Sequence, residues 1–228
     1  MNDVAAPDRA SKAPLVWIDC EMTGLDPAID ELVEVAVIVT DATLHPLAEG
    51  IDLIIRANQP ALDQMSDFVV EMHTKSGLID VIAQGLPLKE AEQMVLDYIR
   101  SLVPQPNTAQ LAGNSIGQDQ RFLRKYMPAV IDYLHYRLVD VSTIKELAKR
   151  WYPRVYVCAP GKNGSHRALA DIQDSIVELE YYRRSLFPEE LIPEHGTYHR
   201  IADDVIAEAQ RWFPGYGETS SESESTKS

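Results

Sequence analysis

The chain has 228 residues, of which 45% are hydrophobic and 25% are charged, and it contains two cysteines. This length is typical of one domain with a sizeable buried core. No run approaches the roughly 18 consecutive apolar residues of a membrane helix, and two cysteines are too few for a disulfide scaffold. The opening segment MNDVAAPDRASKAP lacks the apolar core of a secretion signal. We therefore expect a cytoplasmic protein that does not bind membranes.

The net charge is −14, from 21 basic and 35 acidic residues, and it argues against a protein that coats long nucleic acids. The charge is uneven, because residues 121–167 carry ten basic and three acidic side chains, a local charge of +7. This window is either a helix-rich stretch with solvated cations or an anion site for a ligand with few phosphates.

The first half of the chain opens with apolar runs rich in β-formers, and their short links predict an antiparallel meander. The predicted strands are Leu15–Asp19, Glu31–Asp41 and Ile51–Arg56. The apolar period then becomes helical over Pro87–Val103, behind a proline start.

The second half alternates between predicted strands and helices, which indicates an α/β domain with a mixed sheet flanked by helices. In chain order we expect strand Gln110–Asn114, helix Gln118–Met127, strand Arg137–Val141, helix Thr143–Trp151 capped by Ser142, loop Pro153–Arg167, and helices Ala168–Leu186 and Tyr198–Phe213.

Two acids end the first predicted strand. Asp19 and Glu21 are two residues apart, so alternation along a strand places both carboxylates on one face. Paired carboxylates repel each other unless a proton or a cation lies between them, and hard divalent ions prefer oxygen ligands. Taken alone, such a pair is more often an exposed strand end.

Two further segments carry candidate functional residues. His166 comes from a glycine-rich loop, and Asp171 follows it in the first turn of a predicted helix. Asp119 lies in the first turn of another, directly after the segment GNSIG. With Asp19 and Glu21 these residues give four acids and one neutral base, which suits a two-metal phosphoryl-transfer site.

The segment GNSIG also allows a different interpretation, because it fits the G-x-S-x-G elbow of serine hydrolases. Ser115 would then be the nucleophile, with Asp140 and His166 as its partners. This interpretation leaves the strand-end acids without a role, and the sequence has no HGGG-type oxyanion segment.

Four motifs, in order and at natural spacing, resemble the oligoribonuclease family of DEDDh exonucleases, which have an RNase T-like, ribonuclease H-like fold. They are WIDCEMTGLDP (Trp17–Pro27), LAGNSIGQDQRFL (Leu111–Leu123), HYRLVDVSTIKELAKRWYP (His135–Pro153) and SHRALADI (Ser165–Ile172). The resemblance covers residues 14–187 and is expected to stop there. It implies a flexible N-terminus over 1–13, an exonuclease domain over 14–187, a helical extension over 188–213 and a disordered acidic tail over 214–228.

The resemblance implies a 3′-to-5′ exoribonuclease that hydrolyses short RNA, especially dinucleotides, to 5′-mononucleotides. Asp19, Glu21, Asp119 and Asp171 would hold two divalent cations, Mg²⁺ or Mn²⁺, and His166 would be the general base. A catalytically inactive RNA-binding protein of the same fold is a further alternative, although all five catalytic positions are filled.

The resemblance also implies a set of residues that contact the substrate and a homodimer that completes the site. Leu25 matches a residue that wedges between bases, and Phe68 stands where relatives often place a stacking tryptophan. Ser115 is implied to be a hydroxyl that contacts the substrate. His73, Arg137 and Ser142 match a cap that grips the 5′ phosphate, and part of this cap, with Tyr136 beside it, is implied to come from the second protomer.

Overall fold

The computed structural model describes residues 13–161, 167–187 and 195–212. The described residues up to Phe187 belong to one compact unit, and those from His195 onward belong to a second. The elements of the first unit are β1 (Leu15–Met22), β2 (Leu32–Thr40), β3 (Ile51–Ile54), α1 (Gln59–Asp63), α2 (Asp67–Lys75), the 3-10 helix Ile82–Gln84, α3 (Leu88–Leu102), β4 (Gln110–Gly113), α4 (Gly117–Tyr126), α5 (Pro128–Tyr133), β5 (His135–Asp140), α6 (Val141–Trp151), α7 (Pro153–Val157) and α8 (Ala168–Leu186).

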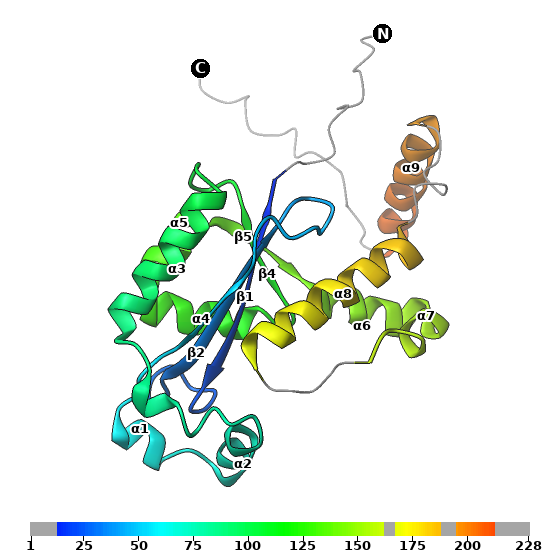
Figure 1. The fold of residues 1–228 in the computed structure, drawn as a ribbon. Coiled ribbons are helices and arrows are strands. Elements are labelled where there is room, and N and C mark those ends of the chain that lie inside the picture. The colour runs from blue at the N-terminus through cyan, green and yellow to red at the C-terminus, as the bar shows by residue number, and fades with distance from the viewer. Residues whose placement is uncertain (1–12, 162–166, 188–194, 213–228) are drawn as a thin grey trace, which may run out of the picture. The chain divides into compact units, whose positions relative to one another are not determined.

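The five strands form one mixed sheet in the order β3-β2-β1-β4-β5 (Figure 1). Strands β1, β2 and β3 pair antiparallel, which confirms the predicted meander. Strands β4 and β5 join the other side of β1 in parallel. The predicted α/β architecture is therefore confirmed.

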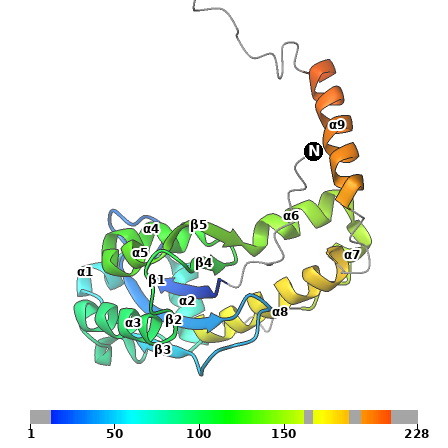
Figure 2. The ribbon, with the colours of Figure 1, turned by 90° about the horizontal axis from the view of Figure 1, so that it is seen from above.

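Helices cover both faces of this sheet, so alternate residues of β1 and β2 enter two different hydrophobic cores (Figure 1). Val16 and Ile18 pack on the face covered by α3, α4 and α5, whereas Trp17 packs on the face covered by α6 and α8. Figure 2 gives a view from above, in which α3, α8 and the strands of the sheet are labelled. Because β2 is buried along all nine residues, the central sheet is a rigid base for side chains at its ends.

Several predicted boundaries were wrong. The predicted loop after Pro153 begins as helix α7, and the segment between β3 and α3 contains α1 and α2, where no element was expected. These helices are short, so they depend on tertiary packing more than on local pattern. Asp140, not Ser142, caps α6: its Oδ1 accepts from the Ser142 amide at 2.9 Å.

The second unit contains α9 (His195–Trp212), which confirms a helix near the predicted place. Its apolar residues Tyr198, Ile201, Val205 and Ile206 are exposed. In the part of the chain that the structure describes, no helix is both long and apolar enough to span a bilayer. Residues 1–12 and the predicted acidic tail from 214 lie outside the described residues.

Candidate active site

Three acids from two elements meet at the end of β1. Oxygen atoms of Asp19 and Glu21 on β1 and of Asp171 on α8 all lie within 4.8 Å of one another. Strand alternation puts the first two on one face, and Asp171 lies in the first turn of α8, which packs on β1 and β2. The predicted convergence of these three carboxylates is confirmed. We call them the acidic cluster.

The fourth predicted acid, Asp119, lies beside this cluster. It is in the first turn of α4 and is 6% exposed, and its Oδ1 accepts a hydrogen bond from the Cys20 amide at 3.1 Å. This bond ties α4 to the residue between Asp19 and Glu21. Asp119 therefore reaches the same strand end from a third element, as the motif spacing predicted.

The electrostatics of the cluster favour a cation. Burial and the nearby carboxylates of Glu34, Asp171 and Asp119 raise the pKa of Glu21 to about 8. Burial likewise raises the pKa of Asp119 to about 7, although its backbone hydrogen bonds oppose the shift. Acids gathered this closely hold protons at neutral pH unless positive charge compensates them. An all-oxygen donor set with excess negative charge fits a hard divalent ion.

A buried ion pair next to the cluster was missed by the sequence analysis. Glu34 on β2 is fully buried, and Arg167 binds it at 2.7 Å and binds Asp52 at 3.4 Å. The second oxygen of Glu34 accepts from the Ala168 amide at 3.3 Å, at the start of α8. Glu34 therefore fixes the helix that carries Asp171. The signal that could have identified Glu34 was its position as the only acid in the otherwise apolar run LVEVAVIV.

Ser115 lies in the turn between β4 and α4, but its contacts differ from those of a serine nucleophile. Its backbone is left-handed, with φ of 53°, and its amide donates to Asp140 Oδ1 at 3.0 Å and to Ser142 Oγ at 2.8 Å. Its hydroxyl lies 3.0 Å from Ser142 Oγ. Asp140 is thus occupied by two backbone amides, those of Ser115 and Ser142.

Leu25 and Phe68 line a cavity of about 560 Å³ that also contains Glu21. Both side chains are 73% exposed, which is unusual for large apolar residues in a core-forming sequence. The cavity therefore extends from the acidic cluster to two exposed apolar groups, an arrangement suited to a nucleobase.

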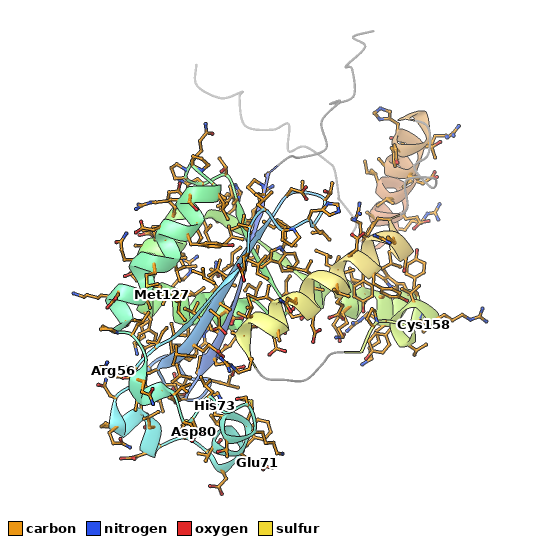
Figure 3. All side chains as sticks on the ribbon, in the orientation of Figure 1. Arg56, Glu71, His73, Asp80, Met127 and Cys158 are labelled. Carbon is orange, nitrogen blue, oxygen red and sulfur yellow. The ribbon has the colours of Figure 1, made fainter. Side chains whose placement is uncertain are left out.

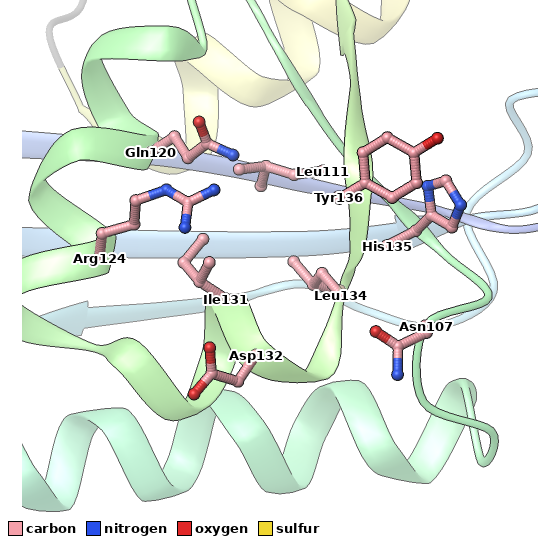
Figure 4. Close-up of a pocket in the computed structure, with 9 residues that line it drawn as sticks. All are labelled: Asn107, Leu111, Gln120, Arg124, Ile131, Asp132, Leu134, His135 and Tyr136. Carbon is pink, nitrogen blue, oxygen red and sulfur yellow. The ribbon is translucent and has the colours of Figure 1, made fainter.

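The remaining predicted contacts lie on separate elements. His73 on α2 (Figure 3) is fully buried, and its Nε2 lies 2.9 Å from the Met22 carbonyl oxygen at the end of β1. Tyr136 on β5 is 73% exposed, and its hydroxyl accepts from Arg137 Nε at 3.2 Å. Tyr136 and Arg124 line a second cavity, of about 460 Å³ (Figure 4). His166, the predicted base, lies outside the described residues.

Curated relatives match this chain along most of its length. The exonuclease family of RNase T type matches residues 16–179. An oligoribonuclease of Leifsonia xyli is 59% identical over 203 residues, which are 89% of this chain and 97% of that protein. An oligoribonuclease of Cutibacterium acnes is 53% identical over 203 residues, which are 89% of this chain and 98% of that protein. Since 203 residues cannot fit within 14–187, the expectation that the resemblance stops at Phe187 was wrong.

Solved structures with a similar fold are exonucleases. Exonuclease I from Methylocaldum szegediense superposes with a TM-score of 0.60 at 17% identity, over 86% of this chain and 45% of that one. E. coli exonuclease I in complex with a dT13 oligonucleotide gives 0.60 at 14% identity, over 86% and 46%. At these identities the similarity concerns the fold alone. Sequence similarity along almost the whole length of its relatives, with an acidic cluster on an exonuclease fold, shows that the chain belongs to the oligoribonuclease family of exonucleases.

Proposed function

We propose that the protein is a 3′-to-5′ exoribonuclease that degrades short RNA, down to dinucleotides, to 5′-mononucleotides. The observation that carries this proposal is the acidic cluster of Asp19, Glu21 and Asp171, with Asp119 beside it, in a chain that is 59% identical to an oligoribonuclease. The pocket beside the cluster fits a base and the net charge of −14 disfavours long RNA, so both features support a short substrate.

The four acids would hold two divalent cations, Mg²⁺ or Mn²⁺. When bound, such ions acidify water and stabilise the charge that builds up on the phosphate and on the leaving oxygen. The protein supplies the geometry: Glu34 and Arg167 fix the start of α8, and the Cys20 amide orients Asp119.

His166 is proposed as the general base, because a neutral imidazole accepts a proton near neutral pH. A water oxygen forms the new bond to phosphorus while the bond from phosphorus to the 3′ oxygen breaks. The water proton goes to His166, which later releases it to solvent, and the 3′ oxygen takes a proton from solvent water as it leaves. Support for this role is its place in the motif SHRALADI, directly before Arg167.

The substrate would lie between the exposed Leu25 and Phe68 at its bases and Ser115, Ser142 and Arg137 at its phosphate end. The exposed Tyr136 supports a homodimer in which one protomer contributes to the site of its partner. His73 would act indirectly, because its side chain is fully buried and its Nε2 lies against the carbonyl oxygen of Met22, which lines the cavity of Leu25 and Phe68. A cytoplasmic location fits a substrate class produced by RNA turnover.

The test uses a 5′-phosphorylated dinucleotide and, separately, a seven-residue RNA, each with Mn²⁺ or with EDTA. We expect release of mononucleotides that needs the metal and is faster on the dinucleotide. Cleavage of the longer RNA alone would contradict the short-substrate part of the proposal. Activity that survives EDTA would contradict the metal-dependent mechanism.

A further inference from the structure

A buried ion pair joins α6 and α8 outside the acidic cluster. Lys145 Nζ on α6 lies 2.9 Å from Glu178 Oε1 on α8, where the Glu178 side chain is 4% exposed and the Lys145 side chain is 34% exposed. A carboxylate this deeply buried is stable only when its charge and its hydrogen-bond capacity are both satisfied. The pair therefore holds one end of a polar network in a fixed place.

The network continues through Asn114, at the end of β4. Asn114 Nδ2 donates to Glu178 Oε2 at 3.1 Å and to Ser175 Oγ at 2.9 Å. A carboxylate only accepts hydrogen bonds, so it fixes which way the amide points. Asn114 Oδ1 then faces the opposite direction and accepts from Ser142 Oγ at 3.1 Å.

The orientation of Asn114 determines the direction of the hydrogen bonds that follow. Ser142 has one hydroxyl proton, and it donates that proton to Asn114. In the 3.0 Å contact between the two serine hydroxyls, Ser115 must then be the donor. Ser142 Oγ also accepts from the Ser115 amide at 2.8 Å. Both lone pairs of Ser142 therefore hold Ser115, and the exposed Ser115 hydroxyl is the end of the network.

Ser115 needs this support because its backbone is strained. A non-glycine residue with φ of 53° has a conformation that its surroundings must impose. Here the two acceptors of its amide, Asp140 and Ser142, impose it. Loss of the charge at Glu178 would weaken one of the two acceptors of Asn114 Nδ2, leaving Ser175 Oγ as the other, and so loosen the orientation of Asn114 and its hold on Ser142.

We propose that Lys145 and Glu178 are positioning residues that fix, through Asn114 and Ser142, the place of Ser115, whose exposed hydroxyl turns its proton from Ser142 to the phosphate end of a short RNA when that RNA binds. This inference rests on the proposed function, because Ser115 is a substrate contact only in that function. It assigns no chemical step to either residue.

The test compares Glu178→Gln with wild type on a 5′-phosphorylated dinucleotide. The variant should lose binding free energy equal to about one hydrogen bond, which raises KM roughly fivefold. The kcat should change by less than about twofold. The Kd of the same dinucleotide, measured by calorimetry with Ca²⁺ in place of Mn²⁺, should rise equally. Glu180→Gln is the matched control, because Glu180 forms an exposed ion pair on the same helix. Lys145→Arg in the otherwise wild-type protein keeps a cation beside Glu178, so its KM should stay close to the wild-type value.

A double-mutant cycle separates positioning from general damage. In a Ser115→Ala background, Glu178→Gln should raise Kd by less than about twofold, since the hydroxyl through which it mainly acts is already removed. Equal effects in both backgrounds, an unchanged KM in the single variant, or a fall in kcat at constant KM would each overturn the inference. If the single variant unfolds, the cycle is repeated with Asn114→Ala, for which the same outcomes apply.

The outcomes also distinguish this inference from the proposed function. If wild type releases no mononucleotide but Glu178→Gln still weakens dinucleotide binding, the function fails and the positioning role stands. If wild type cleaves and the variant binds equally well, the function stands and the positioning role fails. If wild type neither cleaves nor binds the dinucleotide, both are overturned.

Discussion

Glu21 on β1 and Glu34 on β2 are directly opposite each other in adjacent antiparallel strands, so two buried carboxylates lie side by side. The negative charge of Glu34 is one cause of the raised pKa of Glu21, and Arg167 acts in the opposite direction. Arg167 thus neutralises Glu34, whose charge would otherwise add to that of the acidic cluster. Through Glu34 it also anchors the start of α8.

Replacing Arg167 with methionine should therefore destabilise the fold. Glu34 would remain buried without its cation, and we expect a loss of roughly 2 kcal/mol, less than for a fully buried pair because Arg167 is 36% exposed. Urea unfolding measures the change. Arg184→Met is the control, since its pair with Glu180 is exposed, and it should change stability by less than about 0.5 kcal/mol. Equal losses in both variants would contradict the special role of Arg167.

The stability of the metal-free protein should fall as pH rises from 6 to 9. The pKa of Glu21 is about 8 in the folded chain, against an ordinary value of 4.5, so folding retains a proton that the unfolded chain has lost. The stability from this group is present below pH 4.5 and lost as pH rises through 8. We expect Tm in EDTA to fall by roughly 5 °C across this range.

Added Mn²⁺ should restore Tm more at pH 8.5 than at pH 6, because the ion replaces the proton. Thermal melts at both pH values, with Mn²⁺ and with EDTA, measure this. In Glu21→Gln the fall of Tm in EDTA should be smaller and should end near pH 7, because the remaining dependence comes from Asp119, whose pKa is about 7. A wild-type Tm in EDTA that is constant between pH 6 and 9 would be inconsistent with this account.

Asp171→Asn should abolish turnover with the fold retained. It removes one of the three carboxylates of the acidic cluster that we propose to bind metal, so we expect a loss of kcat of roughly 10³-fold. Asp174→Asn, one turn further along α8, is outside the cluster and should retain activity within about threefold. The assay is mononucleotide release from the dinucleotide, with circular dichroism as a check of folding. Comparable losses in both variants would indicate damage to the helix.

Phe68→Ala should weaken binding of the base. Stacking on an aromatic ring contributes about 1–3 kcal/mol per base, so KM for the dinucleotide should rise by roughly tenfold or more. Phe68→Trp should lower KM, because the larger ring offers more stacking area. Val70→Ala, which removes another exposed apolar side chain of α2, is the control and should leave KM unchanged. A KM that does not respond to Phe68→Ala would remove this residue from the substrate site.

The four acids that we propose to bind metal could be predicted from the sequence because strand alternation, helical first turns and the family motifs together indicated their places. Strand alternation aligned Asp19 with Glu21, and helical first turns carried Asp119 and Asp171 to the same strand end. The burial of His73 could not be predicted, since it depends on how α2 packs against the end of β1. The Glu178 network could not be predicted either, because it joins residues from β4, α6 and α8 that are neighbours only in the folded chain.

The acidic cluster draws its members from both ends of the catalytic unit, with residues 19 and 21 on one side and residue 171 on the other. During synthesis the first two carboxylates leave the ribosome long before the third is made. A nascent chain therefore lacks the third carboxylate of the cluster until the start of α8 has been translated. The order of residues along the chain thus delays assembly of the cluster until all five strands of the sheet have been translated.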